Sequence, residues 1–221
     1  NARLEPGELD LNSLSLTDEL ANLLLSGQVT LEEADKRLTE IDAMPSPYGK
    51  LITGCSFGLS TGAFGMLMGA SWSEIFWSGL FGFVVYFWVL WSERSKRVAL
   101  MLEPVIAYVV AFLACVASRF FDPGINIPII ILSSVIIFVP GLALTMGLAE
   151  LSSRNMVSGT ARIMDAMMQL FKLYFGAFLG VATGFSLFGE NTYAPAESLP
   201  YWSTWLAVVL LGFGLVAIFR T

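Results

Sequence analysis

The sequence predicts an all-α integral membrane protein, in which six transmembrane helices follow a short cytoplasmic helical hairpin. Hydrophobic residues make up 56% of the 221 residues and charged residues only 14%, and the mean hydropathy is +0.71. A soluble chain of this length would not ordinarily carry so much apolar surface. The apolar residues are also gathered into six runs, each approaching the roughly 20 residues that cross a hydrocarbon core of about 30 Å.

The helical hairpin is predicted between Leu11 and Ala43, where two short amphipathic helices are joined at Gly27. Thr30 and Glu33 have the spacing of a capping box at the start of the second helix. Its apolar residues then recur at helical spacing, and prolines 45 and 47 end it. We expect this hairpin to pack on the cytoplasmic membrane face or on upstream sequence, in preference to forming a ligand site.

Charge and cysteine content exclude several classes of function. The net charge of −6 is concentrated in the first fifty residues, where ten acids accompany four bases. This pattern is typical of a solvated helical face and argues against a nucleic-acid partner. Cys55 and Cys115 both lie in apolar runs, so the sequence predicts no disulfide framework, no metal site and no cofactor.

The six apolar runs set the expected spans. We place them at residues 51–70, 74–91, 98–118, 127–149, 163–185 and 201–219. Only the turn at residues 92–97 separates the second run from the third, so these two spans are expected to form a hairpin.

The distribution of Lys and Arg predicts that both ends of the chain are cytoplasmic. With that orientation the outer loops hold Arg119 alone, and cytoplasmic segments normally carry the excess of basic residues. The expected cytoplasmic residues are Arg3, Lys36, Arg37, Lys50, Arg94, Lys96, Arg97, Arg154, Arg162 and Arg220.

Glycines spaced by four residues mark two spans for close helix packing. They are Gly54, Gly58 and Gly62 in the first span, and Gly176 and Gly180, continued by Gly184, in the fifth. Such faces let helix backbones approach each other, within one chain or between copies, so a homo-oligomer is one expectation. If the two faces met, they would form a sliding surface of the kind that an alternating-access carrier needs.

A polar stripe runs along the fifth span. Arg162, Asp165, Gln169 and Lys172 are spaced 3, 4 and 3, and therefore share one narrow helix face that Gly176 continues. The stripe resembles one wall of a hydrated path. Lys172, about 15 Å deeper than Arg162 at helical rise, needs a carboxylate partner, for which Asp165, Glu150 and Glu103 are available. An equally weighted alternative is that Lys172 simply ties two helices together.

Glu103, which precedes Pro104 about a third of the way into the third span, is a candidate proton carrier. The alternative that we favour places Glu103 near the cytoplasmic interface, paired with Arg97 or Lys96. Since the chain contains no histidine, proton coupling within it must use carboxylates.

Pro140 and Gly141 interrupt the fourth apolar run, just before the polar connector 150–162. A proline inside a membrane frees a backbone carbonyl, and a glycine lets the chain turn. Membrane proteins tolerate such a pair only where protein or a water-filled cavity satisfies the freed groups, and transporters place their sites at broken helices of this kind.

The sequence around this break resembles the threonine/serine exporter (ThrE) family. The segment Val139–Gly141, then Thr145, Glu150-Leu151, Arg154 and the run 157–162 (VSGTAR) are similar to the PG, EL and SGxAR pattern of that family. Similarity extends from Arg3 to about Phe185. The resemblance implies a first membrane domain of five spans, followed by a second membrane domain that is fused or made separately. It also implies an upstream cytoplasmic domain, so we expect a fragment of a longer protein.

Three segments follow from this resemblance. Residues 1–50 would be a cytoplasmic helical segment that ends a larger N-terminal domain, residues 51–185 the five-helix transmembrane domain, and residues 186–221 a loop and the first helix of a second membrane domain. The expected location is the bacterial inner membrane, and the expected partners are the bilayer, the second domain and a small-molecule substrate.

The resemblance implies export of threonine and serine, driven by the proton gradient. Carbonyls at Pro140 and Gly141 would meet the substrate ammonium, Lys172 or a half-helix N-terminus its carboxylate, and Thr145 its hydroxyl, with Gln169 on the same face. Asp165 or Glu103 would carry the proton. The cytoplasmic gate would be formed by Glu150, Arg154, Ser158 and Arg162.

Three alternatives to amino-acid export remain open. Lys172 would also suit a dicarboxylate such as succinate, and the glycine faces would suit a structural or assembly subunit. An enzyme is disfavoured, because the sequence has no HExxH, no GxSxG and no histidine.

Overall fold

The computed structural model describes residues 11–42, 48–92, 94, 101–189 and 199–219. Helices dominate these residues, which contain no strand, so the predicted all-α fold class is confirmed. Several expectations fall outside the described residues: Arg3 and Arg220 in the orientation argument, prolines 45 and 47, and most of the turn 92–97.

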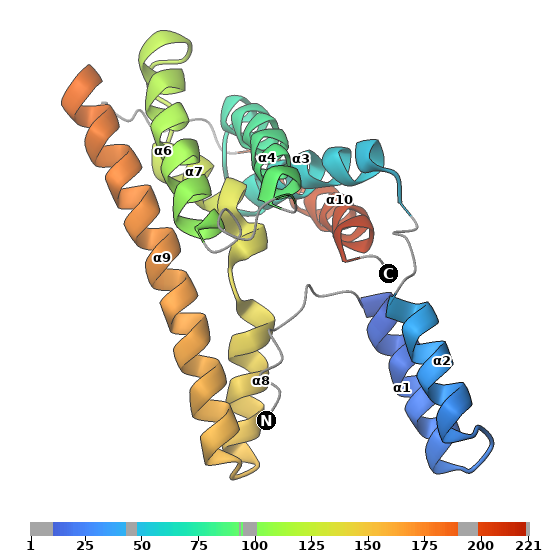
Figure 1. Cartoon of the computed structure of the whole chain (residues 1–221). Helices are drawn as coiled ribbons and strands as arrows, with labels where there is room; N and C mark the ends of the chain where they lie inside the picture. The colour runs from blue at the N-terminus through green and yellow to red at the C-terminus, as the bar shows by residue number, and fades with distance from the viewer. Residues whose placement is uncertain (1–10, 43–47, 93, 95–100, 190–198, 220–221) are drawn as a thin grey trace.

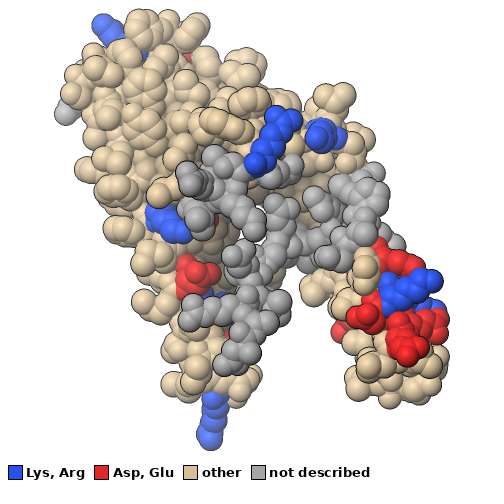
Figure 2. All heavy atoms as spheres, in the orientation of Figure 1, with Lys and Arg blue, Asp and Glu red and all other residues tan. Residues whose placement is uncertain are grey.

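The predicted N-terminal hairpin is present as α1 (Leu11–Leu25) and α2 (Leu31–Asp42). Gly27 adopts the left-handed conformation that this turn requires, with φ of 73°, and the Thr30 hydroxyl accepts the Glu33 N–H at 3.4 Å. The hairpin stands apart from the other helices (Figure 1). Acidic and basic side chains gather on it, whereas the upper part of the α6–α9 pair is almost uncharged except at its end (Figure 2).

Helices α3 (Lys50–Leu67), α4 (Trp72–Ser92) and α10 (Trp202–Ile218) pack together. A Cβ added at Gly54 would meet the Tyr86 ring, and one at Gly58 would meet the Phe83 ring and the Gly79 carbonyl. Because earlier residues of α3 face later residues of α4, the two helices run in opposite directions. The first glycine face is therefore filled by α4.

Helices α6 (Leu102–Phe120) and α9 (Met156–Phe188) lie side by side (Figure 1). A Cβ at Gly176 would collide with the Pro104 carbonyl, one at Gly180 would meet the Tyr108 carbonyl, and one at Gly184 the Cys115 side chain. Both helices thus run in the same direction, as the predicted alternation of spans requires.

These contacts also correct one expectation. The two glycine faces do not meet, because each approaches a different neighbouring helix: α4 packs on the first face and α6 on the second. No sliding surface between α3 and α9 exists in the described structure.

The fourth apolar run is broken, as Pro140 predicts. It forms α7 (Ile127–Val135), the 3₁₀ turn η1 (Ile136–Phe138) and α8 (Gly141–Ser152), and the two halves are bent by 62°. Helix α7 packs on α3, α4 and α6, whereas α8 packs on the first half of α9.

The number of spans differs from the expected six. In the described residues, α4, α6 and α9 are long and apolar enough to cross a membrane, and the bent pair α7–α8 makes a fourth if it counts as one span. Helix α10 is apolar but has only 17 residues. Each of the six apolar runs contains a helix within the described residues, and the chain is a multi-pass membrane protein, but six crossings are not established.

Candidate functional site

The break in the fourth run is made by Pro140. With φ of −77° and ψ of 53°, Pro140 has the conformation of the central residue of an inverse γ-turn, and the Gly141 N–H donates to the Val139 carbonyl at 2.8 Å. Gly141 itself begins α8 without a positive φ, and a Cβ there would meet nothing within 4 Å. The expectation that Gly141 provides the turn is therefore wrong.

A side chain of α9 satisfies the backbone at this break. Gln169 Nε2 donates to the Phe138 carbonyl at 3.2 Å. The Val139 carbonyl is likewise occupied by the Gly141 N–H. The Pro140 carbonyl, which the sequence predicted would face substrate together with that of Gly141, accepts the Leu144 N–H at 3.0 Å inside α8. Protein donors thus hold the Phe138, Val139 and Pro140 carbonyls.

One helical turn beyond Gln169, Lys172 lies beside Glu103 of α6. Lys172 Nζ is 4.0 Å from Glu103 Oε2, which is too long for a hydrogen bond and leaves an ion pair only. The Glu103 side chain is 20% exposed, and its Oε2 has no hydrogen-bond partner among the described residues. Among the three carboxylates proposed from the sequence, Glu103 is thus the one that faces Lys172.

Glu103 lies in the first turn of α6, not a third of the way into a span. The helix begins at Leu102, and Pro104 is tolerated there because N–H groups of a first helical turn have no partner within the helix. Lys172 is therefore level with the start of α6. Lys96 and Arg97, the alternative partners of Glu103, lie outside the described residues.

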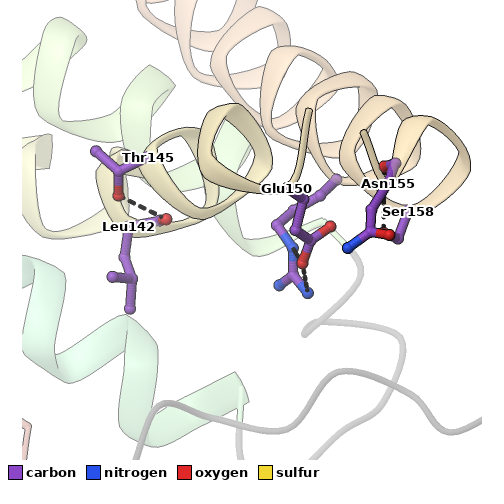
Figure 3. Close-up of polar contacts among 6 residues, drawn as sticks. Leu142, Thr145, Glu150, Asn155 and Ser158 are labelled. Carbon is purple, nitrogen blue, oxygen red and sulfur yellow. Dashed lines mark hydrogen bonds and ion pairs between the residues drawn. The ribbon is translucent and has the colours of Figure 1, made fainter. Parts of the chain in front are cut away.

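The α8–α9 connection carries a second ion pair. Arg162 donates to Glu150 Oε1 from Nη2 at 3.0 Å and from Nε at 3.2 Å. Both residues are helical, so the expected polar connector 150–162 shrinks to residues 153–155, and α9 begins at Met156 rather than near residue 163. Figure 3 shows Glu150 turned toward this partner.

Arg154 closes the C-terminus of α8 in a left-handed conformation, with φ of 63°. Its N–H donates to the Leu151 carbonyl, and the Asn155 N–H donates to the Glu150 carbonyl, which is the Schellman pattern usually completed by glycine. Ser158 makes only a long contact of 3.5 Å with the Asn155 carbonyl (Figure 3). Arg154 and Ser158 are both exposed at this turn.

Two expected site residues are not brought to the Glu103–Lys172 pair. Thr145 is exposed on α8, and its hydroxyl donates back to the Leu142 carbonyl at 2.9 Å (Figure 3). Asp165 is exposed and makes no hydrogen bond or ion pair with the described part of the chain.

The polar stripe of α9 therefore contacts three different elements in succession. Arg162 pairs with α8, Gln169 with the break, and Lys172 with α6. An amide and an ion pair, one turn apart beside a broken helix, provide a donor, an acceptor and a charge of each sign. Such a set can bind a zwitterion by exchanging protein partners for ligand groups.

Sequence reasoning missed a close approach between α8 and α9. A Cβ at Gly147 would meet Ile163, and one at Gly159 would meet the Gly147 carbonyl and Leu151. The glycine spacing in the sequence did not indicate this contact, because each helix contributes a single glycine to it and not a repeated pattern.

Sequence reasoning also missed a buried carboxylate at the opposite end of the molecule. Glu74 is 2% exposed, and its two oxygens accept the Ser71 and Asn126 N–H groups, each at 2.7 Å. It thereby joins the N-termini of α4 and α7. The Ser71-x-x-Glu74 capping-box spacing was the available signal.

Comparisons with known proteins agree with the resemblance. The ThrE family model, described as "Putative threonine/serine exporter", matches residues 2–184. The chain is 24% identical over 215 residues to a "Threonine/serine exporter" of Corynebacterium glutamicum, covering 93% of this chain and 43% of that protein. It is 27% identical over 177 residues to "Pheromone-regulated membrane protein 10" of Yarrowia lipolytica, covering 78% of this chain and 14% of that protein.

An uncharacterized protein of Schizosaccharomyces pombe is 22% identical over 191 residues, or 82% of this chain and 22% of that protein. The chain thus spans less than half the length of each of these relatives. No solved structure matches it. Since the family model covers most of the chain, including the broken span and the polar stripe, the chain belongs to the ThrE family.

Proposed function

We propose that this chain forms part of a proton-coupled secondary transporter, not an enzyme, which exports small hydroxy amino acids such as threonine and serine. Family membership and the name of the Corynebacterium relative support this substrate class. The observation that carries the proposal is the Gln169 bond to the Phe138 carbonyl, one turn from the Glu103–Lys172 pair.

The break would bind the substrate ammonium. An ammonium is a stronger donor than the neutral amide of Gln169, so it can replace that amide at the Phe138 carbonyl. The freed Gln169 amide would then bond the substrate, and Thr145 on α8 would meet its hydroxyl.

Lys172 would bind the substrate carboxylate and so link binding to proton movement. When Lys172 turns to the substrate, Glu103 loses its cation, and Glu103 is the first candidate to carry the coupled proton. Asp165 is the second candidate carrier. The Glu150–Arg162 pair, with Arg154 and Ser158 at the adjacent turn, would gate the entrance.

In this arrangement the hairpin and both ends of the chain face the cytoplasm, and a bacterial inner membrane is the proposed location. Transport would further require the second membrane domain, whether fused or separate. Assembly of several copies remains part of the proposal.

The test is uptake of labelled threonine into inverted vesicles that carry the full-length protein and a proton gradient. Lys172→Ala, Asp165→Asn and Gln169→Leu are compared with wild type at matched expression. Uptake that an uncoupler abolishes, and that Lys172→Ala and Gln169→Leu reduce at least tenfold, supports the proposal.

Absence of threonine and serine uptake by the wild-type protein would contradict the substrate class. Succinate uptake under the same conditions would then indicate the dicarboxylate alternative. Normal threonine uptake by Lys172→Ala and Gln169→Leu would indicate that the polar stripe serves helix packing and not substrate binding.

A further inference from the structure

A small cavity of about 90 Å³ lies at the end of the α6–α9 pair opposite Lys172. The last turn of α6, the start of α7 and the end of α9 enclose it. Ser118, on its wall, is 14 residues beyond Pro104 on α6, or about 21 Å at helical rise. The cavity is therefore separate from the site proposed for the break.

Two donors on its wall lack partners within the described structure. Ser118 is 2% exposed, and its hydroxyl makes no hydrogen bond. Arg119, in the last turn of α6, also lines the cavity; it is exposed and forms no ion pair with the described residues. A buried hydroxyl left without a partner is unfavourable, so a molecule that accepts hydrogen bonds should occupy the cavity.

The other walls restrict the size and the charge of that molecule. Ile127, Phe185 and Phe188 make them apolar, and the volume exceeds that of one water but suits only a small group. Neither Asp122, which accepts from the Ser73 hydroxyl, nor Glu74, which accepts two backbone N–H groups, is among the residues that line the cavity. An anion in the cavity would therefore contact neither of these two carboxylates.

Binding of an anion in this cavity depends on Arg119, because the helix ends around the cavity act on a negative charge in opposite directions. The N-terminus of α7 favours negative charge, but α6 and α9 both present C-terminal ends, which disfavour it. The guanidinium supplies the net positive charge and a planar pair of N–H groups that matches a carboxylate. Ser118 supplies a third donor from within the cavity.

We propose that this cavity binds a small carboxylate, held by Arg119 and the Ser118 hydroxyl. The proposal concerns binding and goes beyond the proposed export. The carboxylate has two potential sources, a free carboxylate ion or the carboxylate of an amino acid.

The test is ligand-observed saturation-transfer NMR on the full chain in lipid nanodiscs, with acetate, L-threonine and L-threoninol as probes. Threoninol keeps the ammonium and hydroxyl groups but lacks the carboxylate. Acetate should bind saturably, and Arg119→Gln and Ser118→Ala should each raise its Kd at least tenfold. Lys36→Gln, on the α2 surface, is the control that removes a cation elsewhere. Ser118→Ala deletes a single oxygen and should not disturb folding.

Equal Kd values for acetate and threonine at the Arg119-dependent site would indicate recognition of the carboxylate alone, and tighter threonine binding would indicate an amino-acid source. The proposal is overturned if acetate does not bind saturably, if both variants leave its Kd within twofold, or if threoninol binding also depends on Arg119. Acetate binding without threonine export would remove only the export proposal. Threonine export by a protein that does not bind acetate would contradict only the proposed carboxylate site.

Discussion

The side chain of Gln169 donates a hydrogen bond to the backbone at the break in the fourth apolar run, since its Nε2 lies 3.2 Å from the Phe138 carbonyl oxygen. Neither residue alone indicates this contact. It joins the polar stripe of α9 to the carbonyl of Phe138, two residues before Pro140, and so places the stripe at the bend of the chain.

Removing this donor should impair transport more than stability. Gln169→Leu keeps the side-chain volume but leaves the Phe138 carbonyl without its partner, which costs about 1–3 kcal/mol. We expect threonine uptake to fall at least tenfold, as measured in inverted vesicles. Met168→Leu, at the exposed neighbouring position, is the matched control and should keep wild-type uptake. Equal loss in both variants would show that the effect does not come from this bond.

The Glu103–Lys172 pair should contribute little to folding. At 4.0 Å, with Lys172 42% exposed, its coupling energy should be below about 1 kcal/mol. A double-mutant cycle with Glu103→Gln and Lys172→Met, monitored by thermal unfolding in detergent, measures this quantity. Each single variant should nevertheless lose proton-driven uptake. A coupling of several kcal/mol with uptake retained would favour a purely structural tie.

Gly176 should not tolerate a methyl group. Alanine normally favours a helix over glycine by up to about 1 kcal/mol, but at this position its Cβ would collide with the Pro104 carbonyl. Gly176→Ala should therefore lower the free energy of unfolding by about 1–3 kcal/mol. Gly212→Ala is the control, since a Cβ there meets nothing within 4 Å, and it should be neutral or stabilising. Denaturant unfolding of both variants in the same detergent checks the sign.

Glu74 should be structurally essential although it belongs to no proposed site. Glu74→Gln loses one of two charged acceptors for the Ser71 and Asn126 N–H groups, and we expect a loss of about 1–3 kcal/mol. Glu40→Gln, exposed on α2, should change unfolding by less than about 0.5 kcal/mol. Unchanged stability of Glu74→Gln would mean that the two helix starts are held by other contacts.

Periodicity and hydropathy were sufficient to predict the helices, the N-terminal hairpin and the broken run, because each depends on local pattern or on Pro140. Contacts between helices were not predictable in the same way. The glycine spacing correctly predicted close helix packing, but it did not predict that α9 packs on α6 and not on α3. Similarly, three carboxylates were available to Lys172, and only the fold determines that Glu103 faces it.

The two halves of the broken run are attached to different parts of the molecule. At its start α7 is held to α4 through Glu74 and Asn126, and near its end the Ser133 and Ser78 hydroxyls lie 2.7 Å apart. By contrast, α8 packs on the part of α9 that precedes the contact of α9 with α6. Pro140 thus lies between a helix that is held to α4 and a helix that is held to α9. Because Gln169 belongs to α9 and Phe138 precedes Pro140, their bond joins the two parts, and a movement of α8 together with α9 relative to α7 would break it.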